Sequence, residues 1–322
     1  MLNILQVTFP FFALVLAGYI AAYRRMLPLE AISGLNSFVL FFALPCMLFR
    51  FGAGTPIVQL LDVTLFLAYL VCALLMVGFA VVMSLNARIG WNDAAFGALV
   101  AAFPNTGFMG VPLLVALLGT AAAGPAIVTI TCDMVITTSL CIALSRLDGA
   151  DEHGAAKAAR SALRGVVSNP MPWAILLGAV FSAMDWELIG PVGKTVGLLA
   201  DAASPVALFT IGAVLARSQI RIKDSGHPPI LWRDFLPVAC MKLLLHPTLV
   251  LLVMVSVRQL GFAVDPFSIL CVVLVAALPS ASNVALLSER FEADTGRIAR
   301  IILVTTAAAF LTFSGAVALL KG

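Results

Sequence analysis

Two short stretches of this sequence place a proline and small polar residues inside long apolar runs. They are Pro104-Asn105-Thr106-Gly107 and Pro279-Ser280-Ala281-Ser282-Asn283. A proline inside a helix removes a backbone donor and clashes with the preceding turn, so each stretch predicts a broken helix. The helix that restarts after a break presents free N–H groups and about half a positive elementary charge, which favour anions. The two stretches therefore predict a site for a small anion, and we expect that anion to be a carboxylate.

The half-helices that lead into the breaks should end in free carbonyl groups, which suit a cation. The alternative interpretation is that both prolines are ordinary kinks that shape helix packing. The predicted substrate-binding residues follow from the first interpretation, and Asn36, in an earlier apolar run, is added as a further candidate. They are Asn36, Pro104, Asn105, Thr106, Gly107, Pro279, Ser280, Ser282 and Asn283.

Asp133 is the best candidate for a proton or cation site. It lies in the middle of an apolar run and has threonines close by in the sequence. A charge at membrane depth costs a few kcal/mol, so such a residue usually faces a cavity or a partner. The alternative is a structural aspartate that is capped by those threonines, which are Thr129, Thr131, Thr137 and Thr138.

Lys242 and His246 lie one helical turn apart in a later apolar run. Lys242 could attract the substrate, pair with a carboxylate such as Asp133, or extend its ammonium to the inner headgroups, and we favour the last interpretation. His246 could take part in ion coupling because histidine titrates in the physiological range. It could instead satisfy a local carbonyl. Asp201 is expected to have a structural role.

The elements that hold these residues must lie in a membrane. The chain has 322 residues, of which 62% are hydrophobic and 11% are charged, and its mean hydropathy is +1.09. Soluble domains carry about 25% charged residues, so a soluble fold of this chain would expose too much apolar surface. The net charge of +3 argues against nucleic acid as a partner. The six cysteines lie in apolar runs without metal-binding spacing, so we expect no metal.

A membrane span needs about 20 mostly apolar residues. Ten segments meet this requirement, and the chain is therefore predicted to be an all-α membrane protein. The segments are 3–23, 31–51, 60–85, 94–118, 123–146, 168–184, 192–216, 235–259, 266–288 and 297–320. The longest hydrophilic stretch, 147–168, separates five spans from five. Part of it, 155–167, could form a surface helix with Lys157, Arg160 and Arg164 facing lipid headgroups.

The basic residues predict the orientation of the chain. With the N-terminus outside, 14 lysines and arginines fall on the cytoplasmic side and four on the outer side, and Lys242 lies within a span. Both termini should then be external. The first apolar run has no basic segment before it and reads as a retained span rather than a signal peptide. No N-x-S/T sequon occurs, which agrees with a bacterial inner (plasma) membrane protein.

An internal repeat relates the two proline stretches. Residues 99–104 (LVAAFP) and 274–279 (LVAALP) agree at five of six positions and lie in the fourth and ninth predicted spans. Because each half has an odd number of spans, the second copy should be inverted. The predicted organisation is a first five-helix repeat at 1–146, a cytoplasmic linker at 147–167 and a second repeat at 168–322. Inverted repeats with interrupted helices are typical of secondary transporters.

At these residues the chain resembles the auxin efflux carrier family, which includes bacterial malonate and malate carriers and the plant PIN proteins. Residues 104–114 (PNTGFMGVPLL) are similar to the family's PNxxxxGxPLL stretch. Further similar segments are 42–45 (FALP), 208–212 (LFTIG), 242–247 (KLLLHP) and 277–279 (ALP). The resemblance covers nearly the whole chain.

The resemblance implies a fold like those of bile-acid sodium symporters and NhaA, with crossed, broken helices in spans four and nine. It implies that spans 1, 2, 6 and 7 form a scaffold that often dimerises, and that spans 3–5 and 8–10 form a mobile domain of an elevator-type carrier. Pro104, Asn105 and Pro279 then belong to the crossover. The long cytoplasmic loop of plant members is absent, which argues against auxin itself as the substrate.

The leading hypothesis is a secondary carrier of a mono- or dicarboxylate such as malonate or malate. Transport would be coupled to H⁺ or Na⁺ or run by facilitated diffusion, and no other cofactor is expected. Alternatives are a sodium-coupled symporter of amphipathic organic anions, an auxin-like exporter of aromatic carboxylates, a cation/proton antiporter, and a membrane sensor that binds without transporting. An intramembrane enzyme is not expected, because the chain has no HExxH, GxGD or usable GxSxG motif.

Overall fold

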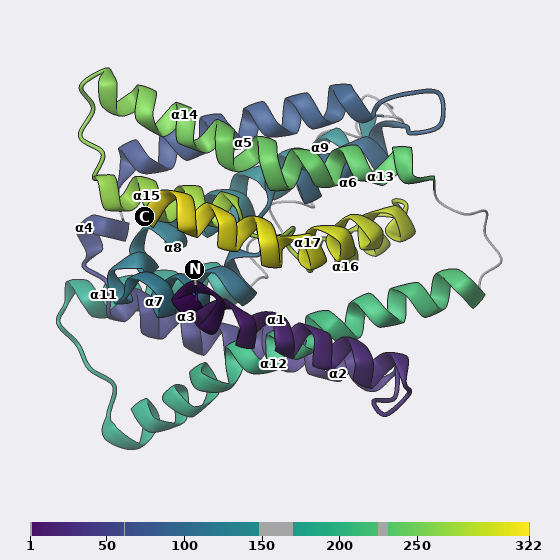
Figure 1. Cartoon of the computed structure of the whole chain (residues 1–322). Coiled ribbons are helices and arrows are strands. Elements are labelled where there is room, and N and C mark those ends of the chain that lie inside the picture. Colours follow the sequence, from purple (N-terminus) through teal and green to yellow (C-terminus); the bar gives the residue numbers. More distant parts are fainter. Residues whose placement is uncertain (1, 61, 148–169, 225–230, 322) are drawn as a thin grey trace. The chain divides into compact units, whose positions relative to one another are not determined.

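The structure is a computed structural model that describes residues 2–60, 62–147, 170–224 and 231–321, and every regular element in them is a helix (Figure 1). The first half contains α1 (Leu2–Tyr23), α2 (Ala31–Phe38), η1 (Val39–Ala43), α3 (Leu44–Ala53), α4 (Ile57–Leu60), α5 (Val63–Ser84), α6 (Trp91–Ala102), η2 (Thr106–Gly110), α7 (Val111–Leu118), η3 (Thr120–Ala122), α8 (Ala123–Cys132), η4 (Asp133–Thr137) and α9 (Thr138–Leu144). The second half contains α11 (Pro170–Ala183), α12 (Gly190–Asp224), α13 (Trp232–Cys240), η6 (Met241–Leu245), α14 (His246–Gln259), α15 (Pro266–Ala276), α16 (Val284–Arg290) and α17 (Thr295–Lys321).

Seven helical stretches of the described residues are long and apolar enough to cross a membrane. They correspond to predicted spans 1, 2, 3, 5, 7, 8 and 10. The predicted sixth span is the 14-residue helix α11, and the fourth and ninth are each divided into shorter helices. An all-helical membrane protein is therefore confirmed, whereas the number of ten crossings stays a prediction. The surface helix expected at 155–167 lies outside the described residues.

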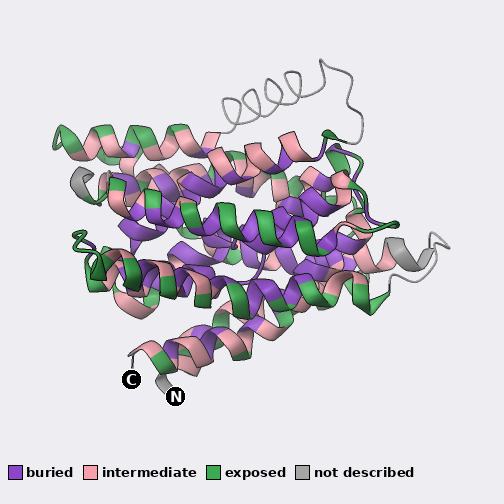
Figure 2. Ribbon diagram, turned by 90° about the horizontal axis from the view of Figure 1, so that it is seen from above, coloured by how far each residue is buried: buried purple, intermediate pink, exposed green. Residues whose placement is uncertain are grey.

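The surfaces of the long helices suit a lipid solvent. On α5, large apolar residues such as Leu67, Val71 and Leu74 are exposed, while Tyr69 and Cys72 are buried. Figure 2 shows buried residues in purple and exposed residues in green along single helices. An exposed apolar face of this length would be unfavourable in water and is compatible with hydrocarbon.

The fourth and ninth predicted spans are interrupted at their prolines. Helix α6 ends at Ala102 and η2 begins at Thr106, so Pro104 lies in the gap between them. Helix α15 ends at Ala276 and α16 begins at Val284, which leaves Pro279 in the second gap. The predicted breaks are confirmed, and these prolines are not simple kinks within continuous helices.

Contacts between residues divide the chain into two compact units. The first unit contains residues 1–63, 106–128 and 169–225, and the second contains 64–105, 129–168 and 226–322. Each unit combines segments from both halves of the chain. The repeat boundaries at 146 and 168, and the grouping of spans into scaffold and mobile domain, stay predictions.

Within the first unit, two helix pairs cross with their backbones in contact. Helix α1 packs on α12, where a Cβ atom at Gly18 would overlap the backbone of Phe209 and one at Gly212 would overlap the backbone of Val15. Helix α3 packs on α11 in the same way, through Gly52 and Gly178. Small residues at such crossings let membrane helices approach closely, which increases their van der Waals contact.

Candidate functional site

The two helix breaks pair with each other in the second unit. The backbone N–H of Asn105 donates to the carbonyl of Pro279 over 2.8 Å, and the N–H of Ala281 donates to the carbonyl of Phe103 over 2.9 Å. These are antiparallel backbone hydrogen bonds, and they satisfy polar groups that the interrupted helices leave without intrahelical partners. The structure therefore brings together Pro104, Asn105, Pro279 and Ser280, which the sequence predicted as one site.

This pairing changes one expectation about the breaks. The half-helices that lead into the breaks were expected to end in free carbonyls that suit a cation, but the carbonyls of Phe103 and Pro279, in the gaps after α6 and α15, each accept a hydrogen bond from the opposite break. The free N–H groups expected after Pro279 are also partly used. The N–H of Ser280 donates to the Thr305 hydroxyl over 3.3 Å, and that of Val284 donates to the Ala281 carbonyl over 3.3 Å. The positive end of the seven-residue helix α16 is thus weaker than the sequence suggested.

Several side-chain oxygens at and near the paired breaks are buried without a hydrogen-bond partner among the described residues. They are Asn105 Oδ1, Ser280 Oγ, Asn283 Oδ1 and Thr306 Oγ1. A buried polar group without a partner costs about 1–3 kcal/mol, so such a set usually binds water or a ligand. The Asn105 amide also carries an NH₂ group, which can donate to a carboxylate. Ser282, the remaining predicted residue of this stretch, is 8% exposed.

Thr106 and Gly107 follow Asn105 along the chain in η2 and are buried, but they belong to the first unit. Asn36 lies in α2, also in the first unit, and is partly exposed. Asp201 forms an ion pair of 2.6 Å with Arg50 inside that unit, which agrees with the structural role expected for it. Of the predicted substrate-binding residues, Thr106, Gly107 and Asn36 therefore fall in the first unit, and the other six fall in the second.

Asp133 is fully buried in the second unit, in the π-helical turn η4. Thr137 donates to its Oδ1 over 3.1 Å, as the threonine-capping interpretation predicts. Tyr69, which was not predicted from the sequence, donates to its Oδ2 over 2.8 Å. The signal that could have identified Tyr69 is its hydroxyl in the middle of an apolar span, because a buried tyrosine hydroxyl usually has a partner.

Lys242 and His246 meet in the interior of the same unit. The Nζ atom of Lys242 donates to the carbonyl of Ala276 over 2.8 Å and lies 2.9 Å from His246 Nδ1. Both side chains are fully buried, so the expectation that Lys242 extends to the headgroups is wrong. The two ion pairs found among the described residues do not include a direct pair between Lys242 and Asp133.

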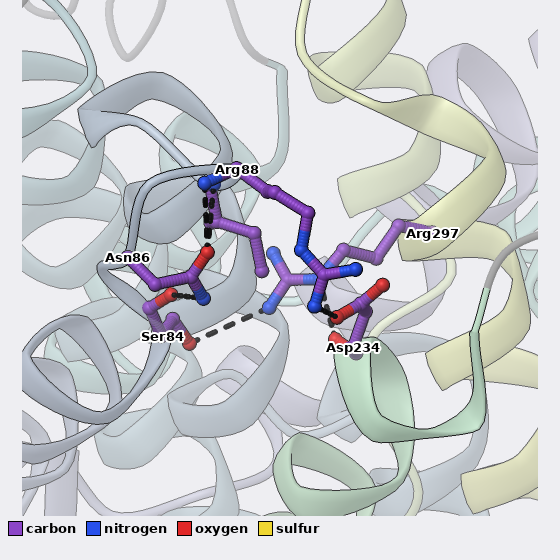
Figure 3. A network of polar contacts seen from close by, with 6 residues as sticks. Ser84, Asn86, Arg88, Asp234 and Arg297 are labelled. Atoms are coloured by element: carbon purple, nitrogen blue, oxygen red, sulfur yellow. Dashed lines mark hydrogen bonds and ion pairs between the residues drawn. The ribbon is translucent and has the colours of Figure 1, made fainter.

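A second polar network of this unit joins loops at the ends of helices (Figure 3). The guanidinium of Arg297 donates to the carbonyl of Asp234 over 2.6 Å, to the carbonyl of Asp93 over 2.9 Å and to the Ser84 hydroxyl over 3.4 Å. Arg88 adds an ion pair of 3.4 Å with Asp234. From the sequence, Arg297 is expected only as one of the 14 basic residues on the cytoplasmic side. Its burial could not be predicted from sequence, because its acceptors come from distant segments.

Comparison with known proteins identifies membrane transporters, and the similarity extends over nearly the whole chain. The profile of the family described as "Membrane transport protein" matches residues 3–317. A protein of Rhizobium meliloti (strain 1021) named "Putative malonate transporter" is 29% identical over 328 residues, covering 100% of this chain and 97% of the relative. An uncharacterized transporter of Methanothermobacter thermautotrophicus is 28% identical over 91% of this chain and 90% of its own. Auxin efflux carrier component 8 of Arabidopsis thaliana is 21% identical over 66% of this chain and 72% of its own.

Proposed function

Because the chain belongs to the membrane transport protein family, in agreement with its resemblance to auxin efflux carriers, we propose that it is a secondary carrier of a small mono- or dicarboxylate such as malonate or malate. The observation that carries this proposal is the pairing of two proline breaks around Asn105 and Ser280, whose buried oxygens have no partner among the described residues. Broken helices that face each other inside the protein are typical substrate and ion sites of secondary transporters. The name of the Rhizobium meliloti relative supports malonate as the first substrate to test.

The substrate would bind at the paired breaks. A carboxylate needs donors, and the candidates are the amides of Asn105 and Asn283 together with the hydroxyls of Ser280 and Thr306. Each of these side chains has a buried oxygen without a partner among the described residues. A carboxylate that accepts hydrogen bonds from these NH₂ and hydroxyl groups would offset part of the cost of burying them.

The glycine crossings of the first unit support the inverted repeat. In an inverted repeat of five-helix halves, span 1 corresponds to span 6 and span 2 corresponds to span 7. A contact between spans 1 and 7 must then have a counterpart between spans 6 and 2. Both contacts exist, as α1 with α12 and α11 with α3. Gly178 follows Gly18 by 160 residues, and Gly212 follows Gly52 by the same 160. Equal spacing at symmetric contacts is expected of a duplicated segment.

The same spacing reveals a second stretch of similarity. Residues 45–53 (PCMLFRFGA) and 205–213 (PVALFTIGA) share proline, leucine, phenylalanine, glycine and alanine at five of nine positions. Together with the repeat at 99–104 and 274–279, this supports two five-helix halves of opposite orientation. Repeats of this kind favour alternating access by movement of one group of helices against the other. We therefore extend the proposal to an elevator-type carrier of the bacterial inner membrane, with both termini outside and with dimerisation through spans 1, 2, 6 and 7.

Counterflow in proteoliposomes tests the proposal. Vesicles that contain the purified protein and unlabelled malonate should accumulate labelled malonate from outside. Asn105→Ala should reduce this accumulation about tenfold or more, since a ligand contact worth 1.4 kcal/mol corresponds to a factor of ten. The exposed amide of Gln259, at the end of α14, provides the matched control, and Gln259→Ala should exchange at the wild-type rate.

The outcomes separate the competing functions. If Asn105→Ala reaches the membrane and exchanges malonate at the normal rate, the paired breaks are not the binding site. Stabilisation by malonate without counterflow would indicate a sensor. Competition by indole-3-acetate but not by malate would favour an exporter of aromatic carboxylates, and competition by a bile salt that depends on Na⁺ would favour a symporter of amphipathic anions.

A further inference from the structure

The carbonyl end of helix α15 is buried in the second unit. A helix that ends leaves its last carbonyls without intrahelical partners, and these carry about half a negative elementary charge. Helix α15 ends at Ala276, and Ala276, Ala277 and Leu278 are buried. Transporters with interrupted helices commonly place a coupling cation such as Na⁺ at such an end. A positive charge at this end is therefore stabilising.

The chain itself supplies a positive charge at this position. The ammonium of Lys242 donates to the carbonyl of Ala276 over 2.8 Å, although the two residues lie on different helical segments, η6 and α15. Lysine has three donors and no acceptor, so His246 Nδ1, at 2.9 Å, accepts from the ammonium. Lysine and histidine are both fully buried, and this ammonium therefore has protein rather than water as its surroundings.

A buried counter-charge belongs to the same unit. Asp133 is held by Tyr69 and Thr137, and the ring centroid of Tyr69 lies 6.3 Å from that of His246. Hydrogen bonds join the end of α15 to Lys242 and His246, and the ring of His246 lies beside the ring of Tyr69, which donates to Asp133; no hydrogen bond among the described residues connects these two rings. We define Lys242, His246, Tyr69, Asp133 and Thr137 as the lysine–aspartate cluster. Lys242 and Asp133 form no direct ion pair; with both groups ionised, the attraction between their opposite charges offsets part of the cost of removing each from water.

We propose that the ammonium of Lys242 is a resident cation, which takes the position that an inorganic coupling cation would otherwise occupy at the carbonyl end of α15. The inference rests on the proposed carrier function and adds to it that Na⁺ is not the coupling ion at this end. Because the charge is covalently attached, it stays with the helices of the second unit throughout a transport cycle. Asp133 balances this charge inside the unit, so the lysine–aspartate cluster needs no ion from solution.

The first test uses the wild-type protein and needs no substrate. Thermal unfolding of the purified carrier is compared in NaCl, LiCl, KCl and choline chloride at equal ionic strength. The midpoints should agree within about 1 °C, since a bound ion would stabilise the folded state by mass action. Malonate counterflow should likewise be equal in NaCl and in choline chloride. A midpoint that rises only with Na⁺, or counterflow that requires Na⁺, would overturn the proposal.

The second test removes the resident cation and returns it in soluble form. Lys242→Ala should lower counterflow about 10- to 100-fold, the range for one charge-assisted hydrogen bond. Propylammonium chloride should restore most of it, whereas propan-1-ol, which has a similar volume and no charge, should not. Lys194→Ala, at an exposed position of α12, is the matched control and should behave as wild type under all conditions.

The results distinguish this inference from the proposed function. Equal restoration by propan-1-ol would show that Lys242 only fills space, and full activity of Lys242→Ala would show that no cation is needed; either result overturns the inference while malonate transport stands. If no carboxylate is transported, the comparison of thermal unfolding in the four salts still tests the inference about Lys242. If Lys242→Ala does not fold, Lys242→Gln, which keeps a donor for Ala276 without the charge, replaces it and should show the same loss.

Discussion

At the scale of single residues, Pro10, Pro205 and Pro237 lie inside continuous helices, whereas Pro104 and Pro279 lie where helices stop. Each proline removes one backbone donor, so the difference lies in what happens to the released groups. At the two breaks, the groups released from one segment bond to the other segment through Asn105 and Ala281. A break is stable in a membrane protein where a second segment supplies its partners.

Asp133 illustrates how burial makes a single hydrogen bond important. Its carboxylate accepts from Tyr69 and Thr137 and has no access to water. A buried acceptor that loses a donor cannot replace it with solvent. The two donors come from different helices, α5 and η4, so this residue also joins spans of the second unit.

We expect Tyr69→Phe to destabilise the protein by about 1–3 kcal/mol, because it removes one donor to Asp133 and keeps the ring that packs near His246. The measurement is the midpoint of thermal unfolding in detergent. Tyr23→Phe, at an exposed position in α1, serves as the control. Equal midpoints for the two variants would mean that the Tyr69 hydroxyl does not stabilise Asp133.

At the scale of elements, the helix crossings depend on glycines whose neighbours are backbone atoms. A side chain at Gly18, Gly178 or Gly212 would overlap the backbone of the helix opposite, which cannot move aside as a flexible side chain can. Gly78, in the middle of α5, has no atom within 4 Å of the position of an added Cβ. A side chain therefore cannot be accommodated at the glycines of the helix crossings, whereas it can be accommodated at Gly78.

Gly212→Ala should destabilise the protein by about 1–3 kcal/mol or more, because the added methyl group forces α1 and α12 apart. Gly78→Ala should be neutral or stabilising by up to about 1 kcal/mol, because alanine has the higher helix propensity. Thermal unfolding of both variants gives the comparison. Opposite signs are the expected result, and a loss of stability at Gly78 as large as that at Gly212 would contradict the close crossing.

The ends of elements are held by the network of Arg297. Its guanidinium joins the end of α5 and the start of α13 to the start of α17 (Figure 3), and it also donates to the carbonyl of Asp93 at the start of α6. Gly97 in α6 leaves room for it, since a Cβ there would lie 2.9 Å from Nη1 of Arg297. A planar group with five donors in a fixed geometry suits several carbonyl acceptors at once, and lysine could not replace it equally.

At the scale of the whole molecule, the seven long apolar helices and the family match give an integral, multi-pass membrane protein. Its orientation is argued from the 14 basic residues expected in cytoplasmic loops against four outside. Several of them occur close together, as Arg24 with Arg25 and Arg297 with Arg300.

Reporter fusions in a bacterial host should place the C-terminus outside. Alkaline phosphatase fused after residue 322 should be active, and green fluorescent protein at the same position should be dark. Fusions within the stretch 147–168 should give the reverse pattern, because this stretch is predicted to be cytoplasmic. A fluorescent C-terminal fusion would mean an odd number of crossings or the opposite orientation.

The sequence was sufficient to predict a helical membrane protein, because hydrophobic composition and periodicity are local properties of the chain. The apolar runs gave most helices to within a few residues, although α12 continues to Asp224, eight residues beyond the predicted span, and the two prolines marked where helices stop. Asn105 and Pro279 were grouped into one site through the repeat, and their backbones are hydrogen-bonded. Tyr69 and Arg297 were not predicted, because each acts on partners from distant segments.

By itself, the sequence determined that the chain is a helical membrane protein with two interrupted helices, since the choice of solvent and the loss of a backbone donor depend only on residue type. Only the tertiary structure decided which groups meet. It paired the two breaks, used carbonyls that were expected to be free, and brought the ammonium of Lys242 from the expected lipid headgroups to Ala276. The physical reason is that a buried polar group must find a partner, and that partner is chosen by proximity in space rather than along the chain.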